Sequence, residues 1–481
     1  MNKQNHSSEK RKRRRKKNER KAIILAVLVV VSVIALAVTL AAVVFKADFF
    51  TGKNRDEQKD LQENNAKSEI EVTVEDSTDQ IEHGDGQDGA GLGQENETDP
   101  DALDQSTAQN DENVQVLRDV TMVFAGDICF YDAYANMTAL RARGGKIENC
   151  IDEKLLDEMK AADICMVNNE FAYSDRGTPL ADKAFTFCSK PSNVSLLHDM
   201  GVDLVSLANN HVYDYGPDAL LDTLDTLKAA DIPYVGAGRD LDEASAVYYF
   251  EKNGRKIAFI SATQVERNEH PDTKGATDAT PGTFRCFTKD EFAKLTEVIR
   301  EADAQADLTV VYVHWGTENT DELHWAQIEQ APKMVEAGAD LIIGDHPHCL
   351  QNVEYVNGVP VIYSLGNFWF NSKTLDTCLF KVVYRTDGTL SCQLIPAKQH
   401  DCRTDMETGS EKQRILDYMQ CISPNVTFDQ DGNITNTPYT GPKIDYDAVE
   451  RVPDPPAAAT PLPAADPASP VPDNITPVPV Q

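Results

Sequence analysis

The sequence predicts an α/β fold, a layered β-sheet sandwich flanked by helices. Between residues 118 and 425, short runs of β-branched residues alternate with longer segments whose apolar residues recur at helical spacing. Of the 481 residues, 41% are apolar, which is enough to bury a sizeable core. Together these observations exclude a wholly disordered chain.

Seven short segments rich in β-branched residues are predicted strands, because such residues pack well on a pleated surface. In chain order they are 121–125, 163–167, 203–207, 257–261, 308–313, 341–343 and 361–364. Between them, residues 217–230 and 325–337 have helical spacing, and Pro217 suits the first turn of a helix. Asn357-Gly358 lies between two apolar runs and predicts a hairpin turn.

One transmembrane helix is predicted before this domain, over the twenty-four uncharged residues 22–45. As a helix they would reach about 36 Å, whereas the hydrocarbon core of a membrane is roughly 30 Å thick. A cleaved signal peptide is the alternative, although its apolar region is usually about 7–15 residues long. Residues 1–21, with eleven Lys or Arg and two Glu, are expected in the cytoplasm. We therefore expect a single-pass protein of the cell membrane with its main domain outside the cell.

Segments without hydrophobic periodicity flank the predicted domain at 118–425. Residues 46–117 are acidic and predict a disordered tether, and residues 426–481 predict a Pro-rich disordered tail. The formal net charge of −32 argues against a nucleic acid as partner, because an acidic surface repels the phosphate backbone.

Polar side chains follow six of the predicted strands at their C-terminal ends, where open α/β sheets place ligands. The candidate metal ligands among them are Asp127, Glu170, Asn210, His314, His346 and His348. Any one of these motifs alone is usually a turn, but six in register favour a site. Oxygen and nitrogen ligands suit one or two divalent ions of Mn, Fe, Zn or Mg, which would clamp an anionic group and activate water.

Further polar residues lie beside these candidates. His211 could protonate a leaving oxygen and is the candidate catalytic residue. Asp214 and Glu318 are candidates to orient the histidines, and Asn209 and Asn367 to do so or to contact substrate.

The sequence also resembles the CapA family of poly-gamma-glutamate capsule synthesis proteins, whose domain is similar to the calcineurin-like metallophosphoesterases. The resemblance covers about residues 120 to 395. It rests on six blocks in order: FAGDI at 124–128, NEF at 169–171, LANNHVYDYG at 207–216, HWGTE at 314–318, GADLIIGDHPHCLQ at 338–351 and SLGNF at 364–368. It implies a metallophosphoesterase-like fold and a membrane-anchored external domain.

The resemblance also implies roles for the candidate ligands. Asp127 matches the first metal-binding Asp, and Glu170 stands where the phosphoesterases have a bridging Asp. Asn210 and His211 match the Asn-His motif, His314 the penultimate metal His, and His346 with His348 the final His-x-His. Where the phosphoesterases usually have His two residues after the first Asp, this chain has Cys129. Two interpretations therefore stay open: a centre with one metal ion, and a site that binds without hydrolysing.

Two functions follow from these interpretations. The first is a membrane-anchored protein that takes part in capsule or poly-gamma-glutamate synthesis, export or attachment through its metal site. Its partners would be the membrane, an anionic polymer and, as a candidate, a membrane complex that makes the polymer. The alternative is an extracellular metal-dependent phosphoesterase or envelope-polymer hydrolase.

Overall fold

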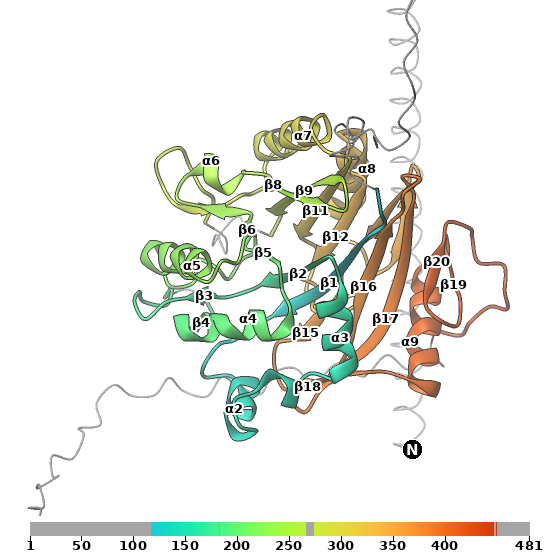
Figure 1. Ribbon diagram of the computed structural model, residues 1–481, viewed down its shortest axis with the longest axis horizontal. Coiled ribbons are helices and arrows are strands. Elements are labelled where there is room, and N and C mark those ends of the chain that lie inside the picture. The colour runs from blue at the N-terminus through green and yellow to red at the C-terminus, as the bar shows by residue number, and fades with distance from the viewer. Residues whose placement is uncertain (1–116, 182, 266–273, 447–448, 450–481) are drawn as a thin grey trace, which may run out of the picture. The chain divides into compact units, whose positions relative to one another are not determined.

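Two β-sheets form the centre of the described part of the chain, residues 117–181, 183–265, 274–446 and 449 of this computed structural model (Figure 1). The predicted transmembrane span 22–45 and most of both predicted tethers lie outside these residues. Among the helices that are described, none combines the length and apolar character that a membrane crossing requires.

The first sheet has ten strands, and its long central path runs β19-β20-β17-β16-β1-β2-β5-β6. Strand β15 pairs with β1, and β18 pairs with β17. Strands β1, β2, β5 and β6 are parallel, whereas β16 and β17 add an antiparallel pair. The strands are β1 Val120–Ile128, β2 Ile164–Asn169, β5 Leu204–Ser206, β6 Tyr234–Val235, β15 Asn367–Trp369, β16 Leu375–Tyr384, β17 Leu390–His400, β18 Arg403–Met406, β19 Thr427–Phe428 and β20 Asn433–Thr435.

The second sheet has six strands in the order β13-β14-β12-β11-β9-β8. Strands β9, β11, β12 and β14 are parallel, so their C-terminal ends meet at one edge. The predicted hairpin joins β13 and β14, with positive φ at Asn357 (50°) and Gly358 (90°), as its turn requires. The strands are β8 Tyr248–Lys252, β9 Arg255–Thr263, β11 Leu308–His314, β12 Leu341–Asp345, β13 Val353–Val356 and β14 Val359–Ile362.

Helices cover the outer face of each sheet. The apolar residues of α2, α3, α4 and α5 pack on the first sheet, and those of α7 and α8 pack on the second. The helices are α2 Ala135–Ala142, α3 Glu153–Ala161, α4 Ser195–Met200, α5 Pro217–Ala229, α6 Leu241–Ala244, α7 Lys289–Asp303, α8 Trp325–Glu336 and α9 Gly409–Ile422, with 3-10 turns η1 Ile147–Asn149 and η2 Pro191–Val194. Two small sheets pair β3 Ala172–Tyr173 with β4 Cys188–Ser189, and β7 Ala237–Gly238 with β10 Gly282–Thr283.

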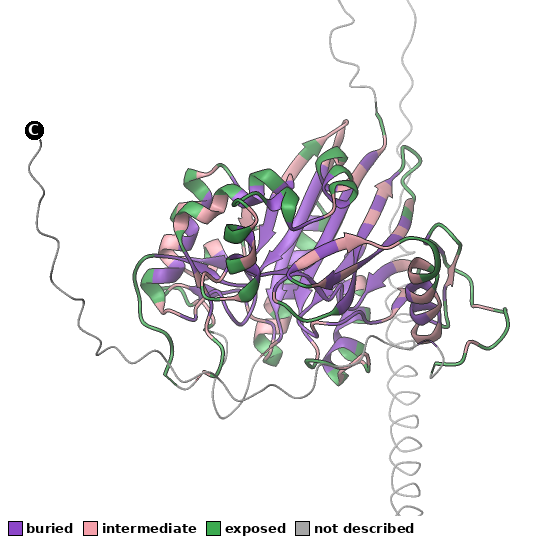
Figure 2. Cartoon of the chain, turned by 90° about the horizontal axis from the view of Figure 1, so that it is seen from below, coloured by how far each residue is buried: buried purple, intermediate pink, exposed green. Residues whose placement is uncertain are grey.

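Alternate residues of each strand fill different layers of the core. On β1, Phe124 faces the layer between the two sheets, where it joins Phe259 of β9, while Val123 faces the helices. Burial on both faces explains why these strands read as continuous apolar runs (Figure 2). The layers are thus helices, sheet, sheet and helices, which confirms the predicted α/β class.

The structure differs from the sequence prediction at the C-terminal side. All seven predicted strands are present within a few residues of their expected bounds, but β16 and β17 were not predicted. Strands β19 and β20 follow residue 425, where we expected the domain to end, and β20 pairs with β17. Segments of two or three residues are too short for a periodic pattern to show.

Candidate metal centre

The candidate ligands meet where the C-terminal ends of the parallel strands of both sheets come together. Asp127 pairs in register with Asn367 of β15 on the first sheet, and His314 pairs with Asp345 at the matching end of the second. The loops that follow β2, β5 and β12 add the remaining ligands. The structure therefore brings together all six predicted ligands, in two groups that share Glu170.

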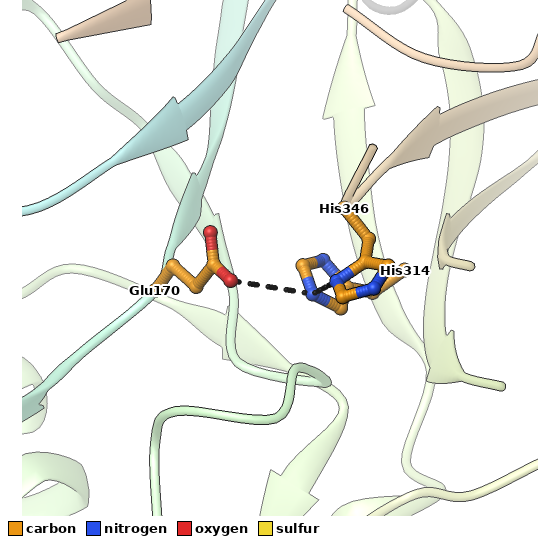
Figure 3. Close-up of side chains that lie close together, drawn as sticks. All are labelled: Glu170, His314 and His346. Carbon is orange, nitrogen blue, oxygen red and sulfur yellow. Dashed lines mark hydrogen bonds and ion pairs between the residues drawn. The ribbon is translucent and has the colours of Figure 1, made fainter. Parts of the chain in front are cut away.

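The first group gathers around Nε2 of His314. This nitrogen lies 2.8 Å from Oδ1 of Asn210. It also lies 3.1 Å from Nδ1 of His346 and 3.4 Å from Oε1 of Glu170, and these three side chains are drawn in Figure 3. Ligands about 2.1 Å from one ion and at right angles to each other lie about 3 Å apart. The spacing in this group, which we call the His314 half, is that of ligands around one ion.

The second group gathers around Nδ1 of His348 and is called the Asp127 half. Oδ2 of Asp127 lies 3.1 Å from this nitrogen, and Oδ1 of Asn367 lies 2.9 Å from it. Ligand atoms of Asp127, Glu170 and His348 all lie within 4.8 Å of one another, as do those of Glu170, His314 and His346. Two groups of side chains could therefore each hold a metal ion, and Glu170 belongs to both.

Glu170 provides the test of whether the residues fit a cation. Its side chain is fully buried, and neither of its carboxylate oxygens has a hydrogen-bond partner among the described residues. Burial, and then the nearby charge of Asp127, raise the pKa of Glu170 well above its usual value. A buried carboxylate without donors is costly, and a divalent ion would remove that cost. The site fits a divalent metal.

The histidines of the two halves hold protons differently. Burial lowers the pKa of His314 to about 3, and burial together with His314 lowers the pKa of His346 well below its usual value. Burial also acts to lower the pKa of His348, but the hydrogen bond and charge of Asp127 outweigh it, so this pKa is raised. His314 and His346 are therefore neutral at pH 7. Nδ1 of His348, in contrast, lies beside two oxygen acceptors, Oδ2 of Asp127 and Oδ1 of Asn367.

His211, the predicted catalytic residue, is held at the edge of the centre. Its Nδ1 lies 2.6 Å from Oδ2 of Asp214, and its Nε2 lies 3.9 Å from Oε1 of Glu170. Asp214 also accepts hydrogen bonds from Nζ of Lys183 at 2.7 Å and from the backbone N–H of Phe187 at 2.7 Å. Asp214 thus holds the ring of His211 so that Nε2 lies on the side of Glu170.

The remaining predicted residues have different surroundings. Asn209 stabilises the loop after β5, because its Oδ1 accepts hydrogen bonds from the backbone N–H groups of His211 (3.0 Å) and Val212 (2.9 Å). Glu318 lies on the exposed loop after β11, and its charge still contributes to raising the pKa values of Glu170 and His348.

Three residues of the site were missed in the sequence. The side-chain amide of Asn168 donates a hydrogen bond to Oδ1 of Asp127 at 2.7 Å. Its position at a strand end, two residues before Glu170, could have identified it. Lys183 comes from an irregular loop with no pattern to find it. The hydroxyl of Tyr312 donates a hydrogen bond to the buried carboxylate of Asp345. In the sequence, Tyr312 cannot be told from the other residues of its strand.

Cys129 is not part of either group of ligands. Its side chain is buried, and burial followed by the charge of Glu170 raises the pKa of its thiol well above the usual value. The Asp127 half forms around Asp127, Glu170 and His348 without it. All ten cysteines lie in the described part of the chain, and none forms a disulfide there.

Comparison with known proteins agrees with the resemblance in the motifs. Residues 121–372 match the family "Bacterial capsule synthesis protein PGA_cap". The PGA biosynthesis protein CapA of Bacillus subtilis (strain 168) is 33% identical over 241 residues, 49% of this chain and 61% of that protein. The capsule biosynthesis protein CapA of Bacillus anthracis is 33% identical over 240 residues, 49% of this chain and 57% of that protein.

The matched part of this chain thus spans about three fifths of the length of these relatives. Among solved structures, a hypothetical protein from Thermus thermophilus aligns over 58% of this chain and 99% of its own, with a TM-score of 0.35 and 16% identity.

Proposed function

Because this chain belongs to the family of bacterial capsule synthesis proteins PGA_cap, we propose that it takes part in the synthesis, export or attachment of an anionic, poly-gamma-glutamate-like polymer through a divalent metal centre. The observation that carries this proposal is Glu170, a buried carboxylate without hydrogen-bond donors between two groups of ligands. The ion could be Mn, Fe, Zn or Mg, because the ligands are oxygen and nitrogen atoms.

The charge of the protein supports a metal as the group that meets the polymer. The chain carries a net charge of −32, and an acidic surface repels an anionic polymer. Bound divalent ions would supply a local positive centre that binds carboxylate oxygens and lowers the pKa of a bound water. Asp127, Glu170, Asn210, His314, His346 and His348 would hold them, while Asp214 keeps His211 aimed at the substrate side.

We place this activity outside the cell, on a domain anchored in the cell membrane. The uncharged residues 22–45 support the anchor, and the basic residues 1–21 support a cytoplasmic N-terminus. A membrane complex that makes or exports the polymer would be the natural partner for such a domain.

The alternative is an extracellular metal-dependent phosphoesterase or envelope-polymer hydrolase. The position of His211 favours it, because Nε2 lies 3.9 Å from Oε1 of Glu170 while Nδ1 is fixed by Asp214. A side chain held in this way can transfer a proton to a leaving oxygen beside the metal centre. The ligands would serve either function.

One set of measurements separates the two functions. The full chain is purified in detergent, its metal content is measured, and phosphoesters and poly-gamma-glutamate are assayed with and without a chelator. A cell lacking the gene is complemented in parallel with wild type, His211→Ala and the double variant His346→Ala, His348→Ala, and its polymer is quantified. His198→Ala, on α4, is the control.

The outcomes are distinct. Polymer lost in the double variant but kept with His211→Ala, without turnover in the assays, supports the capsule role. Chelator-sensitive turnover that His211→Ala abolishes while the metal stays bound supports hydrolysis. Wild-type protein without metal would contradict the metal centre in both functions.

A further inference from the structure

Asn367 lies beside the metal centre because two chain segments approach very closely. The backbone N–H of Asp127 donates to the carbonyl of Gly366 at 3.0 Å, and a Cβ at Gly126 would lie 1.9 Å from that same oxygen. Gly366 has φ +69°, a conformation that favours glycine. Gly126 and Gly366 therefore allow the start of β15 to lie directly against the end of β1, where Asn367 pairs with Asp127.

The side chain of Asn367 has the position of a ligand. The side chain is buried, and its Oδ1 lies 2.9 Å from Nδ1 of His348. Oδ2 of Asp127 lies 3.1 Å from the same nitrogen. These distances match the separation of about 3 Å between neighbouring ligands of one ion. An amide oxygen is an ordinary ligand for a hard divalent ion.

The His314 half provides an internal comparison. There an amide oxygen, Oδ1 of Asn210, lies 2.8 Å from Nε2 of His314, beside the carboxylate of Glu170. The Asp127 half has two carboxylates and one imidazole, and Cys129 stands where the resemblance to the phosphoesterases places a further histidine. The thiol of Cys129 is buried and outside the ligand group, so this half needs one more ligand.

We infer that Oδ1 of Asn367 is the fourth ligand of an ion held by Asp127, Glu170 and His348, and that it compensates for the histidine replaced by Cys129. The inference rests on the proposed metal centre and deepens it. It makes the centre a two-ion site in which each half has one amide ligand, Asn210 in one and Asn367 in the other.

A cysteine placed at position 367 tests whether that side chain touches the ion. The full chain in detergent is titrated with Co²⁺, and its absorption and binding are recorded for wild type, Asn367→Cys, Asn367→Ser and Asn367→Leu. Thiolate bound to Co²⁺ gives a charge-transfer band in the near ultraviolet. We expect Asn367→Cys to gain this band over wild type, whereas Asn367→Ser does not.

Binding affinities provide the second measurement. We expect wild type to bind two Co²⁺ ions, and Asn367→Leu to weaken one of them at least tenfold and leave the other within twofold. Asn210→Leu is the matched variant in the other half and should weaken the other ion. If Asn367→Leu is unfolded by circular dichroism, Asn367→Ala takes its place and should weaken the same ion, because it also lacks the oxygen.

The results that contradict the inference differ from those that contradict the metal centre. Two bound ions in Asn367→Cys without the band, or two unchanged affinities in Asn367→Leu, would show that Asn367 only contacts His348. A wild-type protein that binds a single ion would also overturn the inference. A wild type that binds no Co²⁺ would overturn the proposed function itself.

Discussion

The two halves of the proposed metal centre both offer oxygen and nitrogen atoms as ligands, but the pKa values of their histidines shift in opposite directions. In the His314 half, burial keeps both imidazoles neutral, with the pKa of His314 lowered to about 3. In the Asp127 half, the carboxylate of Asp127 raises the pKa of His348, and the pKa of Asp127 is lowered in turn despite its burial. The difference in pKa comes from the carboxylate of Asp127, whose Oδ2 lies 3.1 Å from Nδ1 of His348.

This difference has a consequence for metal binding. An ion in either half would displace the proton that the raised pKa favours on the shared Glu170, and an ion in the His314 half would otherwise meet only neutral imidazoles. Below its raised pKa His348 carries a second proton, which an ion in the Asp127 half would have to displace before Nδ1 could bind it. We therefore expect the His314 half to hold its ion more tightly, and the predictions below test that comparison.

The largest effect is expected for Glu170→Gln, which changes the residue that both halves share. An amide in place of the carboxylate removes the negative charge between the two ions, so both affinities should fall by on the order of 100-fold or more. Isothermal titration with Mn²⁺ measures this loss. Glu158→Gln, which changes a partly exposed carboxylate paired with Lys381, is the matched control. A variant that still binds one ion as tightly as wild type would show that Glu170 does not bridge.

The next effect separates the halves. His346→Ala should weaken only the ion of the His314 half, and Asp127→Asn only that of the Asp127 half, each by about 10- to 100-fold. Asp127→Asn keeps the shape of the side chain, so the loss would come from charge. Equilibrium dialysis with metal analysis counts the ions that remain. Both variants losing the same ion would refute the division into two halves.

The third prediction concerns pH. Because the pKa of His348 is raised, its proton is retained to higher pH, and the Asp127 half should lose its ion as the pH falls through that pKa. His314, with a pKa of about 3, stays neutral far below this range, so the His314 half should stay occupied. Bound Mn²⁺ measured between about pH 8 and pH 5.5, which spans the usual histidine pKa, should fall from two ions to one. Simultaneous loss of both ions would contradict the comparison.

The residues of the site differ in how visible they were in the sequence. Asp127, Glu170 and the histidines follow predicted strands, and parallel strands bring their C-terminal ends to one edge, so their meeting could be predicted. The division into two halves could not, because it depends on the atoms that face His314 Nε2 and His348 Nδ1. Lys183 reaches Asp214 across 31 positions of sequence from an irregular loop, and only the folded chain shows that contact.

The fold shows the same limit. The apolar runs predicted seven mostly buried parallel strands, β1, β2, β5, β9, β11, β12 and β14. The short parallel strands β6 and β15 and the antiparallel pair β16 and β17 were missed. Several residues of β16 and β17, such as Lys381 and Gln393, are polar and incompletely buried, which weakens the apolar signal. Strands β19 and β20 are too short for a periodic pattern, and β20 joins the sheet by pairing with β17, which is distant in the sequence.

The smallest effect is expected for Cys129→Ser, at the position where the resemblance to the phosphoesterases expects a histidine. The thiol is buried, its pKa is raised by burial and by Glu170, and it stays protonated, so it supplies no ligand to the Asp127 half. Replacing it should leave two bound ions and change either affinity by less than about threefold, although a hydroxyl in this apolar place should cost about 1–2 kcal/mol of folding stability. Mn²⁺ titration and urea unfolding measure the two quantities separately. Loss of the Asp127-half ion in Cys129→Ser would instead show that the sulfur is a ligand, and the two halves would then differ in ligand chemistry as well as in protons.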